Sequence, residues 1–248
     1  MKKLQCAQIW GGIEEGDATV ASPGLTATLF SSSGEGKKGG DIYYVSLCNS
    51  TYITRVAIAD VVGHGEIVSE MSQSLYDSLG RHVDDLNGDE VLSDLNKDAI
   101  TKGITAITTG IVATYYREDK TFSYVYAGHP PMLLNRNNEL EWNEMEIDID
   151  QTSNMSNIPL AIDEDANYVQ QSVTLKTGDR ILLYTDGLLE TTSKTKEAFG
   201  MERLQACLKI NRAREIDELR DDVINALCDH TEGKLEHDDV TVMLLEIR

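Results

Sequence analysis

The chain has 248 residues, of which 42 are Asp or Glu and 22 are Lys or Arg, so its formal charge at neutral pH is −20. Proteins that bind nucleic acids or anionic membranes concentrate Lys and Arg at the contact surface, so this balance argues against both kinds of partner. Apolar residues make up 41% of the sequence and charged residues 26%, which is typical of a folded globular protein.

A single domain over residues 1–248 is the expected organisation, with residues 1–38 forming strands and a loop that lead into the main part. Only 4 prolines are present, and no Ser/Gly-rich tract marks a linker. The N-terminal lysines are not followed by the apolar segment of a signal peptide, and no apolar run approaches the ~18 residues of a membrane span. The 4 cysteines form no CxxC pair. These features predict a cytoplasmic protein with reduced thiols.

The first clear elements are two β-rich stretches, residues 41–48 and 51–60, which predict a hairpin. Beyond this hairpin the apolar residues recur at helical spacing. They predict a helix over residues 66–80, with Gly80 as its stop signal, and a second helix over residues 91–99.

The second half returns to β-rich stretches and ends with a helix and a strand. The predicted strands are residues 107–116, 121–127, 132–135, 168–175, 180–184 and 241–247, and the predicted helix is residues 216–227. The acidic, weakly patterned stretch 141–157 predicts a loop. Because the helices are grouped and do not alternate with every strand, this order predicts an α+β fold of mostly antiparallel sheets flanked by helices.

Four aspartates lie at the ends of apolar strands, and all but Asp60 are next to a glycine or another aspartate: Asp41, Asp60, Asp186 and Asp238. Asp is a poor strand residue because its side chain competes for backbone hydrogen bonds, so each one alone is explained as a turn residue. The four together favour a second hypothesis. Strand ends that meet would cluster these carboxylates, and divalent cations such as Mg²⁺ or Mn²⁺ would relieve the resulting repulsion.

The segments around these aspartates carry a family resemblance over roughly residues 39–248. They resemble the signature set of the metal-dependent PPM-type (protein phosphatase 2C) serine/threonine phosphatases, in the bacterial SpoIIE-like branch. In chain order the segments are Gly39-Gly40-Asp41-Ile42-Tyr43, Ala59-Asp60-Val61-Val62-Gly63-His64-Gly65, Ala127-Gly128-His129-Pro130-Pro131, Tyr184-Thr185-Asp186-Gly187-Leu188-Leu189-Glu190 and His237-Asp238-Asp239-Val240-Thr241-Val242. A single short motif of this kind is a weak signal, whereas five in order are a strong one.

This resemblance implies a sandwich of two antiparallel sheets with helices outside and a site for two divalent cations, Mn²⁺ or Mg²⁺, at one edge. It implies that Asp60 bridges both ions and that the backbone carbonyl of Val61 is a ligand. Asp186 and Asp238 would bind the second ion, and Asp41 would coordinate directly or hold a metal-bound water. The residues expected beside these ligands are Asp239, Gly40 and Gly187.

Three further positions have competing interpretations. His64 resembles the general acid that protonates the leaving alkoxide, but it also fits a turn into the following helix. No Arg precedes Arg55, so Lys37 and Lys38 are the candidates for phosphate binding, although they also fit a solvated loop. His129 lies in a motif that the resemblance leaves without a role, and a structural turn is the expected one.

The resemblance implies metal-activated attack of water on phosphoserine or phosphothreonine of a protein, without a phosphoenzyme. The expected partner is a phosphorylated regulatory protein, such as the anti-sigma-factor antagonist of a partner-switching system. Two alternatives remain: a catalytically weak or silent pseudophosphatase that acts as a sensor or scaffold, and a phosphatase of small metabolites at the same site.

Overall fold

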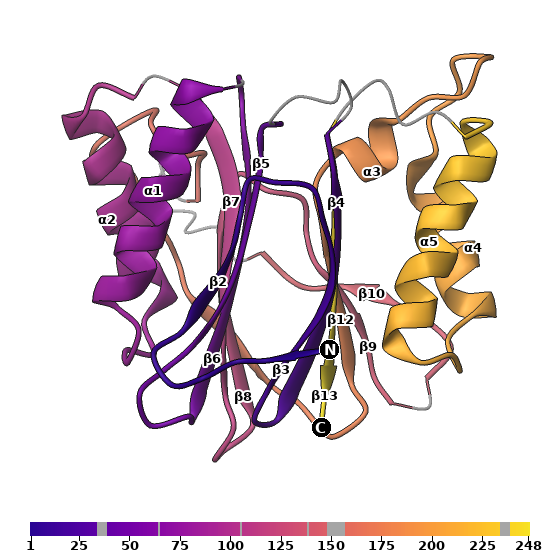
Figure 1. The fold of residues 1–248 in the computed structure, drawn as a ribbon, viewed down its shortest axis with the longest axis horizontal. Coiled ribbons are helices and arrows are strands. Elements are labelled where there is room, and N and C mark those ends of the chain that lie inside the picture. The colour runs from indigo at the N-terminus through magenta and orange to yellow at the C-terminus, as the bar shows by residue number, and fades with distance from the viewer. Residues whose placement is uncertain (34–38, 64, 105, 138, 148–156, 234–238) are drawn as a thin grey trace.

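Two β-sheets packed face to face form the centre of the molecule, and helices cover the outer face of each sheet (Figure 1). The computed structural model describes residues 1–33, 39–63, 65–104, 106–137, 139–147, 157–233 and 239–248. This four-layer arrangement confirms the predicted α+β sandwich flanked by helices.

The six-stranded sheet contains the predicted first hairpin. Its order is β11-β8-β7-β6-β5-β2, and all neighbouring strands are antiparallel. The strands are β2 (Ile9–Gly12), β5 (Asp41–Leu47), β6 (Ile53–Val61), β7 (Thr108–Tyr116), β8 (Thr121–Ala127) and β11 (Gln171–Thr174). The turn between β5 and β6 sets a register in which Asp41 lies opposite Asp60.

The seven-stranded sheet has the order β1-β3-β4-β13-β12-β9-β10. Only β1 and β3 pair in parallel. The strands are β1 (Lys2–Lys3), β3 (Gly16–Ser22), β4 (Leu25–Ser32), β9 (Leu133–Asn135), β10 (Asn143–Glu144), β12 (Arg180–Tyr184) and β13 (Val240–Ile247). Every residue of β13 is buried, because this strand is central in its sheet and is covered on both faces.

Each sheet carries its own helices. The six-stranded sheet is covered by α1 (Glu66–Arg81) and α2 (Gly88–Thr101), and the seven-stranded sheet lies beneath α3 (Gly187–Glu190), α4 (Gly200–Ile210) and α5 (Ile216–His230) (Figure 1). The predicted stop at Gly80 is one residue early, because α1 continues to Arg81. None of the described helices is long and apolar enough to cross a membrane.

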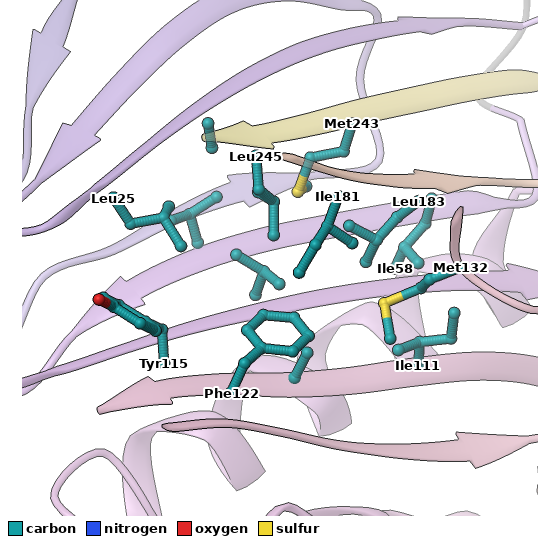
Figure 2. Packing of buried hydrophobic residues seen from close by; sticks show 14 of the residues in the cluster. Leu25, Ile58, Ile111, Tyr115, Phe122, Met132, Ile181, Leu183, Met243 and Leu245 are labelled. Carbon is teal, nitrogen blue, oxygen red and sulfur yellow. The ribbon is translucent and has the colours of Figure 1, made fainter. Parts of the chain in front are cut away.

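The largest apolar cluster lies between the two sheets (Figure 2). Phe122 and Ile58 from the six-stranded sheet meet Ile181 and Leu245 from the other, and each is at most 1% exposed. Burying a side chain of this size stabilises the fold by about 1.5–3 kcal/mol relative to leaving it in water. This cluster fixes the two sheets against each other, and therefore fixes the strand ends that each sheet contributes to the site.

The structure adds detail to the prediction in one place and differs from it in two. The strands and loop expected over residues 1–38 include the four strands β1 to β4. Helix α4 was not predicted. The stretch predicted as a loop, 141–157, begins with the short strand β10 and buries Trp142 and Met145, while its residues 148–156 lie outside the described residues.

Candidate metal centre

Four strand ends meet at one end of the sandwich, the upper end in Figure 1. Strand β5 begins there at Asp41 and β6 ends there at Val61, so Asp41 and Asp60 face each other across the hairpin. From the other sheet, β12 ends just before Asp186 and β13 begins just after Asp239. The sequence prediction that strand ends gather these aspartates is therefore consistent with the topology.

Asp41 is the most enclosed of these carboxylates, with an exposed fraction of 4%. The Thr185 hydroxyl donates a hydrogen bond to its Oδ2 at 2.8 Å. Burial raises the pKa of Asp41 well above its ordinary value, the hydroxyls of Thr241 and Thr185 oppose this, and the charges of Asp60 and Asp239 add to it. A nearby cation would remove the cost of ionising this carboxyl group.

The two threonines that hold Asp41 belong to the other sheet. The Thr185 amide donates to the Thr241 carbonyl at 3.0 Å, and the Thr241 amide donates to the Thr185 hydroxyl at 3.0 Å. Both threonines are fully buried. The Asp41 carboxylate is therefore held by a rigid, fully bonded pair, which is the preorganisation that a metal ligand needs.

Gly40 leaves room for an oxygen-rich cradle beside the Asp41–Asp60 pair. A Cβ at Gly40 would lie 2.5 Å from the Val61 carbonyl oxygen, 3.3 Å from Asp60 Oδ1 and 3.4 Å from the Gly63 carbonyl oxygen. The Val61 amide also donates to the Gly40 carbonyl at 3.1 Å. Carboxylate and carbonyl oxygens are the donors that Mg²⁺ and Mn²⁺ prefer, so the residues here fit such an ion.

Asp239 ties the start of β13 to the start of β5. Its Oδ2 accepts a hydrogen bond from the Gly40 amide, and a Cβ at Gly39 would overlap its carboxyl group. Because this oxygen accepts the Gly40 amide hydrogen bond, Asp239 fits the role that the sequence predicts for it, a residue that supports the metal ligands. The neighbouring predicted ligand, Asp238, lies outside the described residues, as do His64, Lys37 and Lys38.

Asp186 lies at the turn from β12 into the short helix α3. Its carbonyl accepts hydrogen bonds from the amides of Leu189 and Glu190 at 2.8 and 2.9 Å, and Gly187 after it is buried. Thr185, which precedes it, holds Asp41. This turn therefore brings the Asp186 segment to the same end of the sandwich as the Asp41–Asp60 pair.

His129 links the two sheets, whereas the sequence predicts only a structural turn for it. Burial lowers its pKa to about 4, while a hydrogen bond to the Tyr184 carbonyl opposes the shift, so the imidazole is neutral at pH 7. Its Nε2 donates to the Tyr184 carbonyl at 3.0 Å, and its Nδ1 accepts from the Thr109 hydroxyl at 2.9 Å. Thr109 lies opposite Asp60 in β7. His129 therefore joins the two sheets directly behind the aspartates.

Arg55, the first arginine of the chain, does not serve this site. It is 1% exposed and its guanidinium donates to Thr114 Oγ1 and to the carbonyls of His82 and Asp85. All of these partners lie away from the strand ends that carry the aspartates. The positive charge that binds a phosphate group at the site would therefore have to come from a residue other than Arg55 or from a bound cation.

Comparisons with known sequences show the family of the chain. The family model of stage II sporulation protein E (SpoIIE) matches residues 52–248. Protein IcfG of Synechocystis sp. is 26% identical over 234 residues, which cover 82% of this chain and 35% of that protein. Phosphoserine phosphatase RsbU of Bacillus subtilis is 27% identical over 197 residues, covering 77% of this chain and 54% of the relative. The chain thus spans about half or less of the length of these relatives.

Solved structures extend the likeness to the fold. The structure of the RsbU and RsbW domains of Rv1364c from Mycobacterium tuberculosis has a TM-score of 0.76 and 26% identity, covering 94% of this chain and 63% of the other. The PP2C phosphatase domain of SpoIIE from Bacillus subtilis, with a fragment of its regulatory domain, has a TM-score of 0.71 and 17% identity, covering 97% of this chain and 70% of the other.

Proposed function

The chain belongs to the SpoIIE family of PPM-type (protein phosphatase 2C) phosphatases, and we propose that it hydrolyses phosphoserine or phosphothreonine on a protein with two bound divalent cations, Mn²⁺ or Mg²⁺. The observation that carries this proposal is the pairing of Asp41 with Asp60 beside the Val61 carbonyl, in a cradle that a single Cβ at Gly40 would fill. A buried carboxyl group with a raised pKa next to two further carboxylates is a site that a cation would stabilise.

The residues proposed to hold the ions are those that the sequence indicated. Asp60 would bridge the two ions, with the Val61 carbonyl beside it, and Asp186 and Asp238 would bind the second ion. Bound ions would supply a water of lowered pKa and a positive field for the phosphate oxygens. Asp41, steadied by Thr185, would hold a metal or a metal-bound water in one orientation.

Other residues are proposed to act on the substrate. His64 would donate the proton that the leaving serine or threonine oxygen takes up when the phosphorus–oxygen bond breaks. Lys37 and Lys38 would provide the positive charge for the phosphate that Arg55 cannot provide. Gly40, Gly187 and Asp239 would keep the ligands in place.

We infer a protein substrate rather than a metabolite from the relatives that the chain resembles. Phosphoserine phosphatases RsbU and RsbP are among the relatives, which supports a phosphorylated regulator of a partner-switching system, such as an anti-sigma-factor antagonist, as the substrate. The whole-protein activity of those longer relatives is part of this proposal.

Hydrolysis of p-nitrophenyl phosphate and of a phosphoserine peptide, with Mn²⁺ and with a chelator, tests the proposal. We expect Mn²⁺-dependent turnover that Asp186→Ala lowers by at least 100-fold and that the exposed control Asp229→Ala leaves unchanged. Turnover that survives both the chelator and Asp186→Ala would refute the metal mechanism. Absence of turnover in every condition would instead favour a scaffold or sensor.

A further inference from the structure

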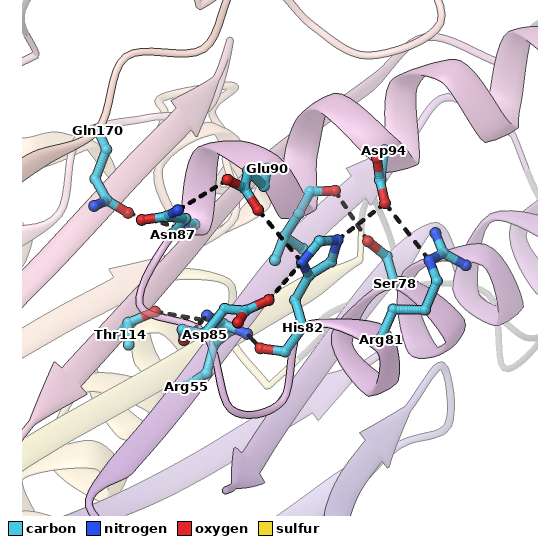
Figure 3. Close-up of polar contacts among 12 residues, drawn as sticks. Arg55, Ser78, Arg81, His82, Asp85, Asn87, Glu90, Asp94, Thr114 and Gln170 are labelled. Atoms are coloured by element: carbon cyan, nitrogen blue, oxygen red, sulfur yellow. Dashed lines mark hydrogen bonds and ion pairs between the residues drawn. The ribbon is translucent and has the colours of Figure 1, made fainter.

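A second cluster of potential metal ligands lies where α1 joins α2 (Figure 3). It consists of His82 Nδ1, Asp85 Oδ2 and Glu90 Oε2, which all lie within 4.8 Å of one another. The Nδ1 atom is 3.0 Å from the Asp85 oxygen and 3.8 Å from the Glu90 oxygen. We propose that these three side chains bind one divalent transition-metal ion of the Zn²⁺ class.

The spacing of the three atoms suits such an ion. Metal–ligand bonds of about 2.0–2.2 Å in a tetrahedral arrangement place the ligand atoms roughly 3.3–3.6 Å apart. The two nitrogen–oxygen distances lie on either side of this range, so small side-chain rotations would complete the geometry. One imidazole nitrogen with two carboxylate oxygens favours Zn²⁺, Co²⁺ or Ni²⁺ over Mg²⁺, which prefers oxygen ligands alone.

The other nitrogen of the ring is oriented as in established metal sites. His82 Nε2 lies 2.9 Å from Asp94 Oδ2, and Arg81 Nε lies 3.5 Å from the same oxygen (Figure 3). A histidine that ligates a metal commonly donates its second N–H to a carboxylate, which fixes the tautomer and the ring orientation. With Nε2 directed to Asp94, Nδ1 faces Asp85 and Glu90, and an incoming ion would displace the proton that Nδ1 donates to Asp85.

The backbone that carries the ligands is also held in place. The buried guanidinium of Arg55 donates to the carbonyls of His82 and Asp85, so both residues are anchored to β6. Asn87 Nδ2 donates to Glu90 Oε1 at 2.9 Å and leaves Oε2 directed toward the imidazole. These bonds reduce the ordering that an incoming ion would have to impose.

This site is separate from the candidate phosphatase centre. Helix α1 has 16 residues, and its first turn follows the segment that carries Asp60 and Val61, whereas His82 caps its other end. At about 1.5 Å per residue, the two sites lie on the order of 24 Å apart along the helix. A bound ion would connect the end of α1 to the first turn of α2 and stiffen the helix pair that covers the six-stranded sheet.

Zn²⁺ titration of the full chain with saturating Mg²⁺ tests this proposal, because Mg²⁺ occupies the all-oxygen centre and leaves the His82 site. We expect one Zn²⁺ per chain by calorimetry, and at least a 10-fold weaker Kd in His82→Gln and in Asp85→Asn/Glu90→Gln. The control Glu70→Gln/Asp89→Asn removes the same charge as the Asp85/Glu90 variant, from α1 and α2, and should bind like the unmodified chain.

Two further readouts separate the metal site from a network of ion pairs. Co²⁺ in place of Zn²⁺ should give visible absorption bands that disappear in His82→Gln, and Zn²⁺ should raise the Tm only where the three ligands are intact. Absence of Zn²⁺ binding with Mg²⁺ present, or equal Kd values in the ligand variants and the unmodified chain, would overturn the proposal. Mn²⁺-dependent phosphatase turnover should be the same in all these variants, so failure of one proposal does not imply failure of the other.

Discussion

Replacing Gly40 by Ala adds one methyl group at the position where the candidate metal centre is most crowded. The new Cβ would lie 2.5 Å from the Val61 carbonyl oxygen and 3.3 Å from Asp60 Oδ1. Since nonbonded carbon contacts are most favourable at about 3.5 Å or more, the Val61 carbonyl would have to move by roughly 1 Å. Both atoms that would move belong to proposed metal ligands.

The displacement is large compared with what a metal site tolerates. Ligand distances in metal sites vary by only about 0.2 Å, and changes to the residues that support ligands lower metal affinity about 10- to 100-fold. Overpacking a tight site also costs about 1–3 kcal/mol of folding free energy. We therefore expect Gly40→Ala to weaken Mn²⁺ binding at least 10-fold while the chain still folds.

Calorimetric titration with Mn²⁺ and Mn²⁺-dependent hydrolysis of p-nitrophenyl phosphate measure the effect, and circular dichroism checks the fold. Gly80→Ala is the matched control, because Gly80 lies in helix α1 and the nearest atom to its added Cβ would be 3.9 Å away. That variant should bind Mn²⁺ normally and gain up to about 1 kcal/mol of stability. If folded Gly40→Ala binds Mn²⁺ within twofold of the unmodified chain, the Val61 carbonyl is not part of a metal site.

Four further predictions follow from the buried groups and the charge. His129→Ala leaves the Thr109 hydroxyl and the Tyr184 carbonyl without their shared partner and opens a cavity, so urea denaturation should show a loss of about 3–5 kcal/mol; a loss below 1 kcal/mol would contradict the bridging role. The pKa of His129 falls from 6.5 in the unfolded chain to about 4 in the folded one, so the unfolded chain binds the proton first as pH decreases. The free energy of unfolding should therefore fall by up to about 3 kcal/mol between pH 6.5 and pH 4. His129→Gln is the reference that removes the contribution of the carboxylates, and a flat profile after this subtraction would argue against a buried neutral ring. The raised pKa of Asp41 extends the pH range over which Mn²⁺ competes with a proton for this carboxylate, so Mn²⁺ affinity should rise with pH through that range and calorimetry in buffers of different ionisation enthalpy should detect proton release there; an affinity that does not change with pH would contradict this. Finally, a chain of charge −20 should repel an acidic phosphoprotein, so kcat/KM at low substrate concentration should rise with moderate salt, and a falling profile would indicate a complementary docking surface.

Much of the fold was predictable because its elements are strongly patterned. The hairpin of β5 and β6 is rich in β-branched and aromatic residues, the helix α1 has clear helical spacing, and the structure confirms both. Helix α4 was missed because only two of its residues, Leu204 and Leu208, are buried, which leaves a weak amphipathic signal.

Strand β4 lies in the region predicted only as strands and a loop, and it shows why its bounds were not predicted. Its sequence alternates apolar residues with threonine and serine, yet Thr26, Thr28 and Ser31 are buried. Ser31 hydrogen-bonds to Thr241, and Thr28 accepts from the buried guanidinium of Arg220. These partners are 210 and 192 residues away in the sequence, so no local pattern could indicate that the hydroxyls would be satisfied inside the protein.

In the candidate site, too, locally recognisable residues could be predicted and residues that depend on distant partners could not. The aspartates were identifiable because a carboxylate at the end of an apolar strand is unusual, and Asp41 and Asp60 do meet across the hairpin. The residues around them were not identifiable. Thr185 donates to Asp41 in the opposite sheet, 144 residues away, and His129 bonds to the Tyr184 carbonyl, 55 residues away, so the local sequence reveals neither role.

The two sheets contribute like charges to one end of the sandwich, and this arrangement couples metal binding to the packing of the sheets. Asp41 and Asp60 come from the six-stranded sheet, and Asp186 and Asp239 lie at the ends of strands in the other. Their repulsion acts across the same interface that the bond from Thr185 to Asp41 and the bond from Gly40 to Asp239 hold together. A cation bound between carboxylates of both sheets would replace this repulsion by attraction. A ligand present at 100 times its Kd stabilises the folded state by about 2.7 kcal/mol, so metal binding should stabilise the packed sheets by this order of magnitude. The cross-sheet bonds therefore oppose this repulsion in the metal-free chain; the bond from Thr185 to Asp41 is buried, and the bond from Gly40 to Asp239 is partly buried.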